Sequence, residues 1–521
     1  MKQLSALDAT FLYMETPYSY GHVASASIYE RPYPGYDAYQ TLRSTVEARL
    51  GVLEPLRRRL VKDPLDLDLP HWVIDPDFDL DFHIRHIGLP PPGDMTQLQA
   101  QVARLAGRPL DQSRPLWEAY VIDGLPDDRF ALFMKMHHAT VDGAAGAELL
   151  GMITDTEPGA DRPELNVPLT PAGRLPTTGD LLRTGLFGLA TQPLKLVRFQ
   201  AKLIKELADS SRNNGLKPLA DVLGKMIPGQ AGSVVRNWAH DEDGVDAPVT
   251  AAPSTFFNAS IGPHRRFEAR SVELARVKAL KTATGATVND VVMAICAGAM
   301  RTWLEGRGEL PEVPLVSMIP VSIRTGEETD RWTNRVSAIF ADIPTDEADP
   351  LVRLAKVNQA MVTGKEQFEM LPADILVELS QAAPHALSIR ASRVASRMRL
   401  GNRVSLPFNL VISNVPGPRE PLYLGEAKLN HYYPVSTVVE GQGLNITVQS
   451  YLNTLDFGLV SCSDLVPDLD RLADLIVSEV QVLEAAVAKA AASKKKAPAK
   501  KKAPAKKKAP AKKKAPAKKK A

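Results

Sequence analysis

Two adjacent histidines end a strand-like run in the stretch MKMHHATVDGAAG, residues 134–146. Histidine can accept and return a proton near neutral pH because its unperturbed pKa lies close to physiological pH. Successive side chains of a strand point to opposite faces, so we expect His137 and His138 to lie in different surroundings. A metal site would need both histidines and Asp142 to converge, and no further His/Glu cluster lies nearby. We therefore expect no bound metal.

The histidine pair has two remaining interpretations. In the first, one histidine is a general base, worth about 10²- to 10⁴-fold in rate, and a nearby carboxylate fixes the loop or the ring. In the second, the pair only ends a buried strand, and Thr140 or Asp142 caps the helix that GAAGAELLGMI would form. The second leaves Gly143 and the repeated histidine unexplained, so the sequence favours the base. A GxSxG elbow, a Walker loop and a GxGxxG after a strand are all lacking.

Alternating strands and helices must position these residues. GHVASASIYE, EAYVIDGL and FALFMKMHH are predicted strands and YDAYQTLRSTVEARL a helix. The same texture returns after residue 263, with helices at VELARVKALKTATG and TVNDVVMAICAGAMRTWL and a final helix from DLDRLADLIV. Further strands are predicted at PLVSMIPVSI, RVSAIFADI, PFNLVISNV, LNITVQSY and LDFGLVSC. This alternation predicts the α/β class.

The length of 521 residues exceeds what one core uses, so two domains are expected. We predict an N-terminal domain over 1–215, a crossover linker over 216–260, a C-terminal domain over 261–493 and a tail over 494–521. The tail repeats KKKAPA and has too much like charge and too little apolar area to fold, which predicts disorder. It holds fifteen lysines and no acid, so the net charge of +3 becomes 3 − 15 = −12 for residues 1–493.

Seven segments together resemble a known family. His137 to Gly143 is similar to the HHxxxDG motif of CoA-dependent acyltransferases, a superfamily that includes chloramphenicol acetyltransferase and peptide-synthetase condensation domains. Pro115-Leu116-Trp117, Asn289-Asp290 and the segments LSALDATFLYMETP, NRVSAIFADIPTD, SNVPGP and PVSTVVEGQG resemble bacterial wax ester synthase/diacylglycerol O-acyltransferases. The matches run in order from about residue 4 to residue 485, which covers nearly the whole folded body.

The resemblance implies two chloramphenicol-acetyltransferase-like domains with the active-site tunnel between them. His138 would be the general base that deprotonates the hydroxyl of diacylglycerol or a long-chain alcohol. The oxygen would then attack the thioester of a long-chain acyl-CoA. His137 and Asp142 would support the geometry, Asp142 through an ion pair, and Gly143 would permit the close turn. Acyl-CoA is a co-substrate, and no cofactor is expected.

Two motifs of the resemblance keep alternatives open. Asn289 and Asp290 either cap the helix that follows them or shape the catalytic tunnel as substrate-binding residues. Pro115, Leu116 and Trp117 either form a packed turn or line the acyl or acceptor pocket. A different class of function also remains open, namely a catalytically silent protein that binds or organises lipid through its tail.

Charge and composition give expectations for location and partners. The two cysteines form no CxxC pattern, and neither a signal peptide nor an apolar span is evident, which predicts a cytoplasmic protein. The lysine tail could bind anionic lipid, at about 1 kcal/mol per lysine near a surface. It could also bind nucleic acid, which we regard as the weaker alternative. The segment 181–214 is predicted to be a basic amphipathic helix, either packed on the body or lying on acidic lipid. We expect peripheral association with the inner membrane face or lipid droplets.

Overall fold

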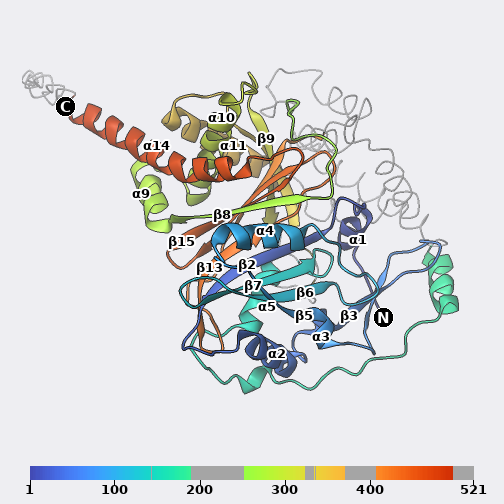
Figure 1. Cartoon of the computed structure of the whole chain (residues 1–521). Helices are drawn as coiled ribbons and strands as arrows, with labels where there is room; N and C mark the ends of the chain where they lie inside the picture. The colour runs from blue at the N-terminus through green and yellow to red at the C-terminus, as the bar shows by residue number, and fades with distance from the viewer. Residues whose placement is uncertain are drawn as a thin grey trace, which may run out of the picture.

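The computed structural model describes residues 1–141, 143–188, 252–322, 332, 334, 336–369 and 406–496. Within these ranges the strands form two six-stranded sheets and one three-stranded sheet, and helices pack against the two large ones (Figure 1). The predicted α/β class and its two similar halves are confirmed.

The N-terminal sheet has the strand order β12-β13-β2-β7-β6-β5 and carries different helices on its two faces. On one face, Leu42 of α2 and Leu149 of α5 belong to the same core as Tyr29 and Phe130 of the sheet. On the other face, α4 packs between this sheet and β8 of the C-terminal sheet. The bounds are β2 His22–Glu30, α2 Ala38–Arg49, β5 Ile84–Gly88, α4 Met95–Ala106, β6 Trp117–Asp123, β7 Arg129–His137 and α5 Gly143–Ile153.

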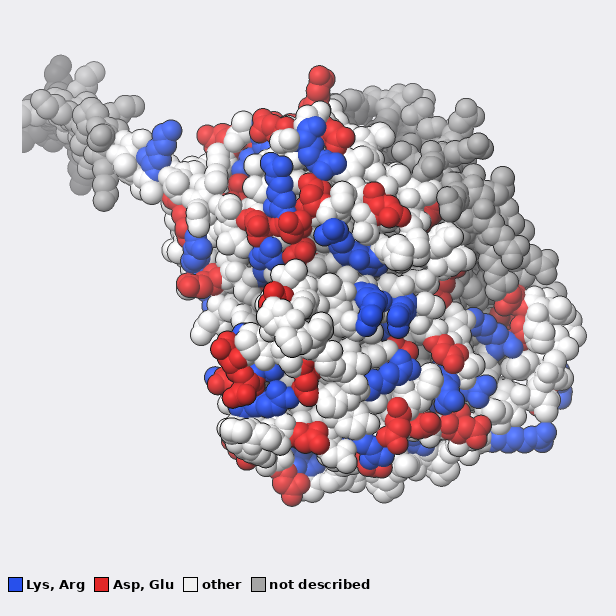
Figure 2. Space-filling model, viewed as in Figure 1, with Lys and Arg blue, Asp and Glu red and all other residues white. Residues whose placement is uncertain are grey.

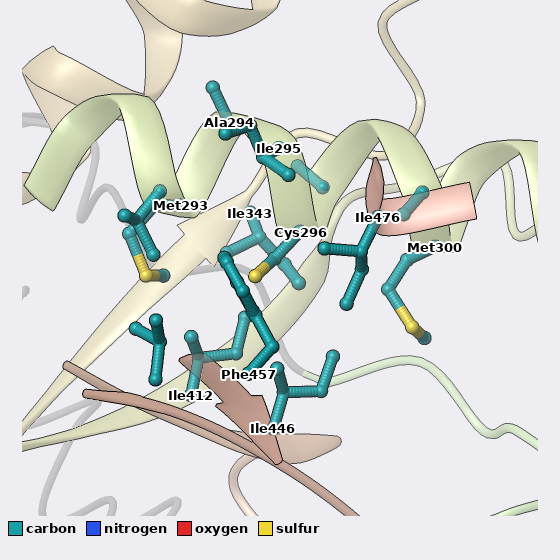
Figure 3. Close-up of a cluster of buried hydrophobic side chains, with 14 of the residues drawn as sticks. Met293, Ala294, Ile295, Cys296, Met300, Ile343, Ile412, Ile446, Phe457 and Ile476 are labelled. Atoms are coloured by element: carbon teal, nitrogen blue, oxygen red, sulfur yellow. The ribbon is translucent and has the colours of Figure 1, made fainter. Parts of the chain in front are cut away.

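The C-terminal sheet has the order β10-β9-β11-β14-β15-β8 and is covered on one face by four helices. Figure 3 shows the core between this sheet and α10, with Ile412 and Ile446 of the strands beside Cys296 of the helix. Burial raises the pKa of the Cys296 thiol to about 12, so the thiol stays protonated at neutral pH. The bounds are β8 Arg265–Glu273, α9 Leu274–Thr284, α10 Val288–Glu305, β9 Leu315–Ser322, β10 Val336–Ile343, α11 Pro350–Glu369, β11 Leu410–Val415, β14 Leu444–Tyr451, β15 Thr454–Cys462 and α14 Leu469–Lys496.

Part of the second half of the sequence belongs to the N-terminal sheet, which the predicted domain bounds do not anticipate. Strands β12 (Tyr423–Leu424) and β13 (Ala427–Val435) lie within the predicted C-terminal domain but belong to the N-terminal sheet. Strand β13 pairs antiparallel with β2 over seven residue pairs. Residues 252–260, predicted as linker, pack on the C-terminal half, where Phe257 is fully buried. Alternation along a strand shows which residues face a core, but it does not show which strand lies beside it.

A polar cluster around the buried Asp456 connects β13 to the C-terminal sheet. The carboxylate of Asp456 on β15 is fully buried and accepts the hydroxyl of Ser271 on β8 at 2.6 Å. It also accepts the backbone N–H of Tyr432 at 2.8 Å and lies 3.2 Å from Nδ1 of His431. The Tyr433 hydroxyl lies 3.0 Å from that of Ser271, and burial raises the pKa of Tyr433 to about 12. We call these five residues the inter-sheet cluster.

The N-terminal segment packs beside a small sheet before it enters the N-terminal half. Strand β1 (Lys2–Gln3) pairs with β4 (His71–Ile74), and β4 pairs with β3 (Arg58–Val61). Helix α1 (Ala6–Tyr13) follows directly and is capped by Ser5, whose side chain accepts the N–H of Asp8. Short helical turns complete this region at η1 Glu54–Arg57, α3 Leu80–His83 and η2 Pro163–Leu165.

The predicted peripheral segments are only partly described. Residues 178–188 are helical, and the rest of the predicted basic helix lies outside the described residues, as does 216–251 of the linker. Helix α14 continues to Lys496, so the first three residues of the predicted tail are helical, and 497–521 lie outside the described residues. In the described part of the chain, no single helix has the length and apolar character needed to cross a membrane. Helices α9 and α10 reach it only as a pair bent by 103°.

Candidate active site

The two histidines lie at the end of the central strand β7, as the sequence predicts. Their backbone is held from both neighbouring strands, because β7 lies between β2 and β6. The N–H of His137 donates to the carbonyl of Leu116 at 2.9 Å, and the N–H of His138 donates to that of Gly21 at 2.7 Å. The rings have different neighbours, which fits the expected alternation of side chains at a strand end.

His137 is fully buried and has a partner at each ring nitrogen. Nδ1 accepts the backbone N–H of Ala139 at 3.0 Å, which places the ring proton on Nε2, 3.2 Å from Oε1 of Glu15. Burial alone would raise the pKa of Glu15, but the hydrogen bond from His137, followed by those from the N–H of Gly21 and the amide of Gln112, holds it below its ordinary value. The Glu15 carboxylate therefore fixes the tautomer of His137.

Gly21 permits this close packing. A Cβ at this position would lie 2.6 Å from the carbonyl oxygen of Phe11 and 2.8 Å from Nε2 of His137. Both distances are well inside van der Waals contact, and one of the two atoms belongs to the backbone. A larger residue would therefore displace either α1 or the ring of His137.

His138 is only partly buried, and its ring contacts residues from both halves of the chain. The ring of Phe11 stacks on it, with 4.2 Å between centroids and 13° between planes. Nδ1 of His138 lies 3.0 Å from Oδ1 of Asn334, which precedes β10 in the C-terminal half. The same Asn334 donates through Nδ2 to the carbonyl of His138 at 2.6 Å and to Oδ1 of Asp8 at 2.5 Å.

Helix α1 presents three residues to the histidine pair. Asp8, Phe11 and Glu15 are spaced by three and four residues, so they follow one side of the helix and its continuation. Asp8 is buried and accepts the hydroxyl of Ser5 at 2.7 Å. Burial raises the pKa of Asp8 although the side chains of Ser5 and Asn334 donate to it.

The Pro115–Trp117 motif forms a packed turn rather than an open surface. All three residues are buried, and the Trp117 indole N–H donates to the carbonyl of Leu56 at 2.7 Å. Trp117 also stacks on the ring of His83, with centroids 4.6 Å apart. Its side chain thus lies in the N-terminal core, and the motif meets the histidine pair through the Leu116 carbonyl.

Asn289 and Asp290 lie in the first turn of α10. The N-cap is Thr287, and Asp290 is the third residue of a capping box, accepting the Thr287 N–H at 2.9 Å. Asp290 also accepts Nδ2 of Asn358 at 2.7 Å, and Asn289 accepts Nδ2 of Asn414 at 3.2 Å. Asp290 therefore takes part in helix capping, but three residues after the N-cap, which is Thr287.

The remaining predicted residues are less fully placed. Gly143 begins α5, and Asp142 lies outside the described residues. Among the described residues, no group of three or more His, Cys, Asp or Glu side chains is placed to hold a metal ion. Sequence reasoning did not single out five residues that surround the pair, namely Asp8, Phe11, Glu15, Gly21 and Asn334. For Asp8, Phe11 and Glu15 the signal was the helical spacing within LSALDATFLYMETP. Asn334 was marked only by its place in the motif NRVS, and no pattern marked Gly21.

Models of two protein families match this chain. The wax ester synthase/diacylglycerol acyltransferase catalytic domain matches residues 4–292, and the WS/DGAT C-terminal domain matches residues 332–484. A probable diacylglycerol O-acyltransferase of Mycobacterium tuberculosis is 35% identical over 488 residues, covering 92% of this chain and 98% of its own. The O-acyltransferase WSD of Acinetobacter baylyi is 32% identical and covers 94% and 98%.

Solved structures agree with these matches. The wax ester synthase/diacylglycerol acyltransferase of Marinobacter aquaeolei VT8 superposes with a TM-score of 0.64 at 28% identity, covering 94% of this chain and all of that one. The first condensation domain of the CDA synthetase reaches a TM-score of 0.51 at 15% identity, covering 92% and 96%. The second likeness concerns the fold alone, and it confirms the two-domain architecture that the histidine motif predicts.

Proposed function

The chain belongs to the wax ester synthase/diacylglycerol acyltransferase family, and from this membership we infer that it moves a long-chain acyl group from acyl-CoA to the hydroxyl of diacylglycerol or of a long-chain alcohol. The protein is thus an acyl-CoA-dependent O-acyltransferase. The observation that carries the assignment to a site is the partly exposed ring of His138 at the end of β7, with Nδ1 directed at Asn334.

In the proposed reaction, Nε2 of His138 takes the proton of the acceptor hydroxyl while the oxygen attacks the thioester carbon. The carbon–sulfur bond then breaks, and the departing sulfur takes the proton from the imidazolium, which yields the ester and free CoA. His137 is fully buried with both ring nitrogens engaged, so we assign it a supporting role. Asp142 and Gly143 keep their proposed roles in the turn that follows. The proposed active-site tunnel lies between the two halves, where His138 meets Asn334.

The motifs Pro115–Trp117 and Asn289–Asp290 are proposed to hold the backbone around the site in place rather than to bind substrate. Leu116 holds the backbone of His137, and Pro115 and Trp117 fix the turn that presents the Leu116 carbonyl. Asn289 and Asp290 fix the start of α10 and its contacts with neighbouring elements. Contacts of these motifs with substrate are a weaker alternative, since Trp117 and Asp290 are already buried.

The function is tested by CoA release from palmitoyl-CoA with dioleoylglycerol or hexadecanol in separate reactions. We expect release of the thiol to depend on the acceptor and to match the triacylglycerol or wax ester formed. Comparison of the two acceptors ranks them. Release that is equal with and without acceptor would indicate a thioesterase instead. No release with either acceptor would favour the catalytically silent lipid-binding alternative.

We also propose that the chain binds the surface of an anionic membrane or lipid droplet from the cytoplasmic side. Leu186 and Phe187 are 59% and 72% exposed at the start of the predicted basic helix. Figure 1 shows the C-terminal end of α14 projecting from the body, and the lysine-rich segment follows this helix in the sequence. On the face in Figure 2, positive and negative side chains are interspersed, so the tail is the stronger source of attraction.

Binding to vesicles tests the role of the tail. We expect the full chain to bind vesicles that contain phosphatidylglycerol, and deletion of residues 494–521 to remove most of that binding. Added salt should weaken the binding because the lysine charges are screened. Vesicles of phosphatidylcholine alone and duplex DNA are the comparison arms. Equal binding of vesicles by the truncated chain would show that the tail is not needed for membrane binding. Tighter binding to DNA than to vesicles would favour nucleic acid as the partner.

A further inference from the structure

We propose that Asn334 is a positioning residue that fixes the ring tautomer of His138, and that Asp8 in turn fixes the side chain of Asn334. The inference rests on the proposed function, in which His138 is the base. The proposed set of three residues draws on both halves of the molecule, so neither half contains it alone. The three residues come from α1, from the end of β7 and from the segment before β10.

The orientation of the Asn334 amide follows from its partners. An asparagine side chain has one acceptor oxygen and two N–H donors on its nitrogen. Nδ2 lies within 2.6 Å of two oxygens, the carbonyl of His138 and the carboxylate of Asp8, and both can only accept. A flipped amide would place its oxygen against both of these acceptors. Oδ1 is therefore the atom that faces Nδ1 of His138.

The tautomer of His138 follows from that orientation. Because Oδ1 can only accept, the hydrogen between the two residues belongs to Nδ1 of His138 at the observed 3.0 Å. In the neutral ring the lone pair then lies on Nε2, which is the nitrogen that the proposed reaction uses. The opposite tautomer would place two lone pairs against each other and leave Nε2 unable to take a proton.

Asp8 holds Asn334 at two points. Its Oδ1 accepts the side-chain Nδ2 and also lies 3.3 Å from the backbone N–H of Asn334. Its other oxygen accepts the hydroxyl of Ser5, the residue that caps α1. The two contacts with Asn334 both require an acceptor oxygen on the side chain of residue 8. The series of contacts from His138 through Asn334 and Asp8 therefore ends at Ser5, the N-cap of α1.

The contact between Oδ1 of Asn334 and Nδ1 of His138 also affects how strong a base His138 is. An acceptor at Nδ1–H stabilises the imidazolium more than the neutral ring, since hydrogen bonds to charged groups are stronger. Loss of Oδ1 should therefore make His138 a weaker base. Other titratable groups near this end of β7 are Asp8, Glu15 and His137. An Asn334→Ala variant keeps all three side chains but removes a donor from Asp8, which raises the pKa of that carboxyl, whereas the pKa of His138 should fall.

The test uses the full chain with Asn334→Ala, Asp8→Ala, Asp8→Asn and the double variant Asn334→Ala/Asp8→Ala. We expect Asn334→Ala to lower kcat about 10²-fold, the usual cost of a misaligned catalytic group, with little change in KM for palmitoyl-CoA. The acid limb of its kcat/KM profile should move about one unit to lower pH. Asp8→Ala should lower kcat in the wild-type background but not further in the Asn334→Ala background. Asp8→Asn keeps an acceptor oxygen and should restore most of the activity.

Asn166→Ala, at an exposed turn of the N-terminal half, is the matched control. Thermal unfolding of each variant shows whether it is folded, and the pH profile of residual activity reports on the base in any folded fraction. Activity of Asn334→Ala within twofold of wild type would overturn the inference, as would an unmoved acid limb or losses that multiply in the double variant. These outcomes require an active wild-type enzyme, so an inactive wild type contradicts the proposed function instead.

Discussion

Replacing His138 with alanine should abolish most acceptor-dependent release of CoA, with a loss of about 10²- to 10⁴-fold, the range that a positioned general base supplies. The side chain is the partly exposed member of the pair, and its Nδ1 is already engaged by Asn334. Without the imidazole, the acceptor hydroxyl has to attack the thioester with its proton in place. The measurement is thiol release from palmitoyl-CoA at saturating acceptor.

Two further histidine variants make this result specific. His86→Ala removes a half-exposed histidine on the outer strand β5 and should leave activity unchanged. His137→Ala removes a buried ring that binds Glu15 and Ala139, so it should lower the unfolding temperature as well as activity. His138→Ala removes the stacking with Phe11 and the hydrogen bond to Asn334 at a partly exposed position, so its unfolding temperature should fall less than that of His137→Ala. Full activity in folded His138→Ala would remove this residue from the mechanism.

Replacing Asp456 with alanine should lower the free energy of unfolding by about 3 kcal/mol, because it leaves buried donors without an acceptor. The carboxylate accepts from Ser271 and from the backbone of Tyr432, and it contacts His431. The substitution also opens a cavity between β13 and the C-terminal sheet. Thermal and urea unfolding of the purified variant would measure the loss.

A second aspartate beside the same cluster provides the control. Asp474 is exposed and pairs with Arg270, the neighbour of Ser271, so Asp474→Ala should change the unfolding free energy by only about 0–1 kcal/mol. Asp456→Asn keeps an acceptor oxygen and should fall between the two. If Asp456→Ala is as stable as Asp474→Ala, the inter-sheet cluster contributes little to holding the sheets together.

Local structure followed from the sequence, whereas partners distant in the chain did not. Alternation predicted β2, β7 and β15, and apolar spacing predicted α10 and α14. The pairing of β13 with β2 was not predictable, because the pattern AKLNHYYPV fits any strand with a buried face. The missed elements include β13, α4 and α11, which have ordinary lengths, as well as the short β1 and α3.

The same distinction applies to the candidate site. The types and spacing of His137 and His138 predicted a base at a strand end, which is a local property. Asn334 lies 196 residues beyond His138, and an asparagine before a strand has no property in the sequence that ties it to a histidine. The sequence leaves open whether Trp117 is a lining residue or a core residue, and its burial against Leu56 and His83, which favours the core, depends on partners distant in the chain.

The exchange of β13 also sets the order in which the protein can be completed during synthesis. Strand β2 ends at Glu30 and its partner begins at Ala427, so about 400 residues are translated between them. At about 5–20 residues per second this takes about 20–80 s, during which one side of β2 has no hydrogen-bonding strand. The ribosome releases Asn334 only after more than half of the chain. A nascent N-terminal half therefore has an unpaired strand and an incomplete base, and transient chaperone binding or aggregation would act on it in that interval.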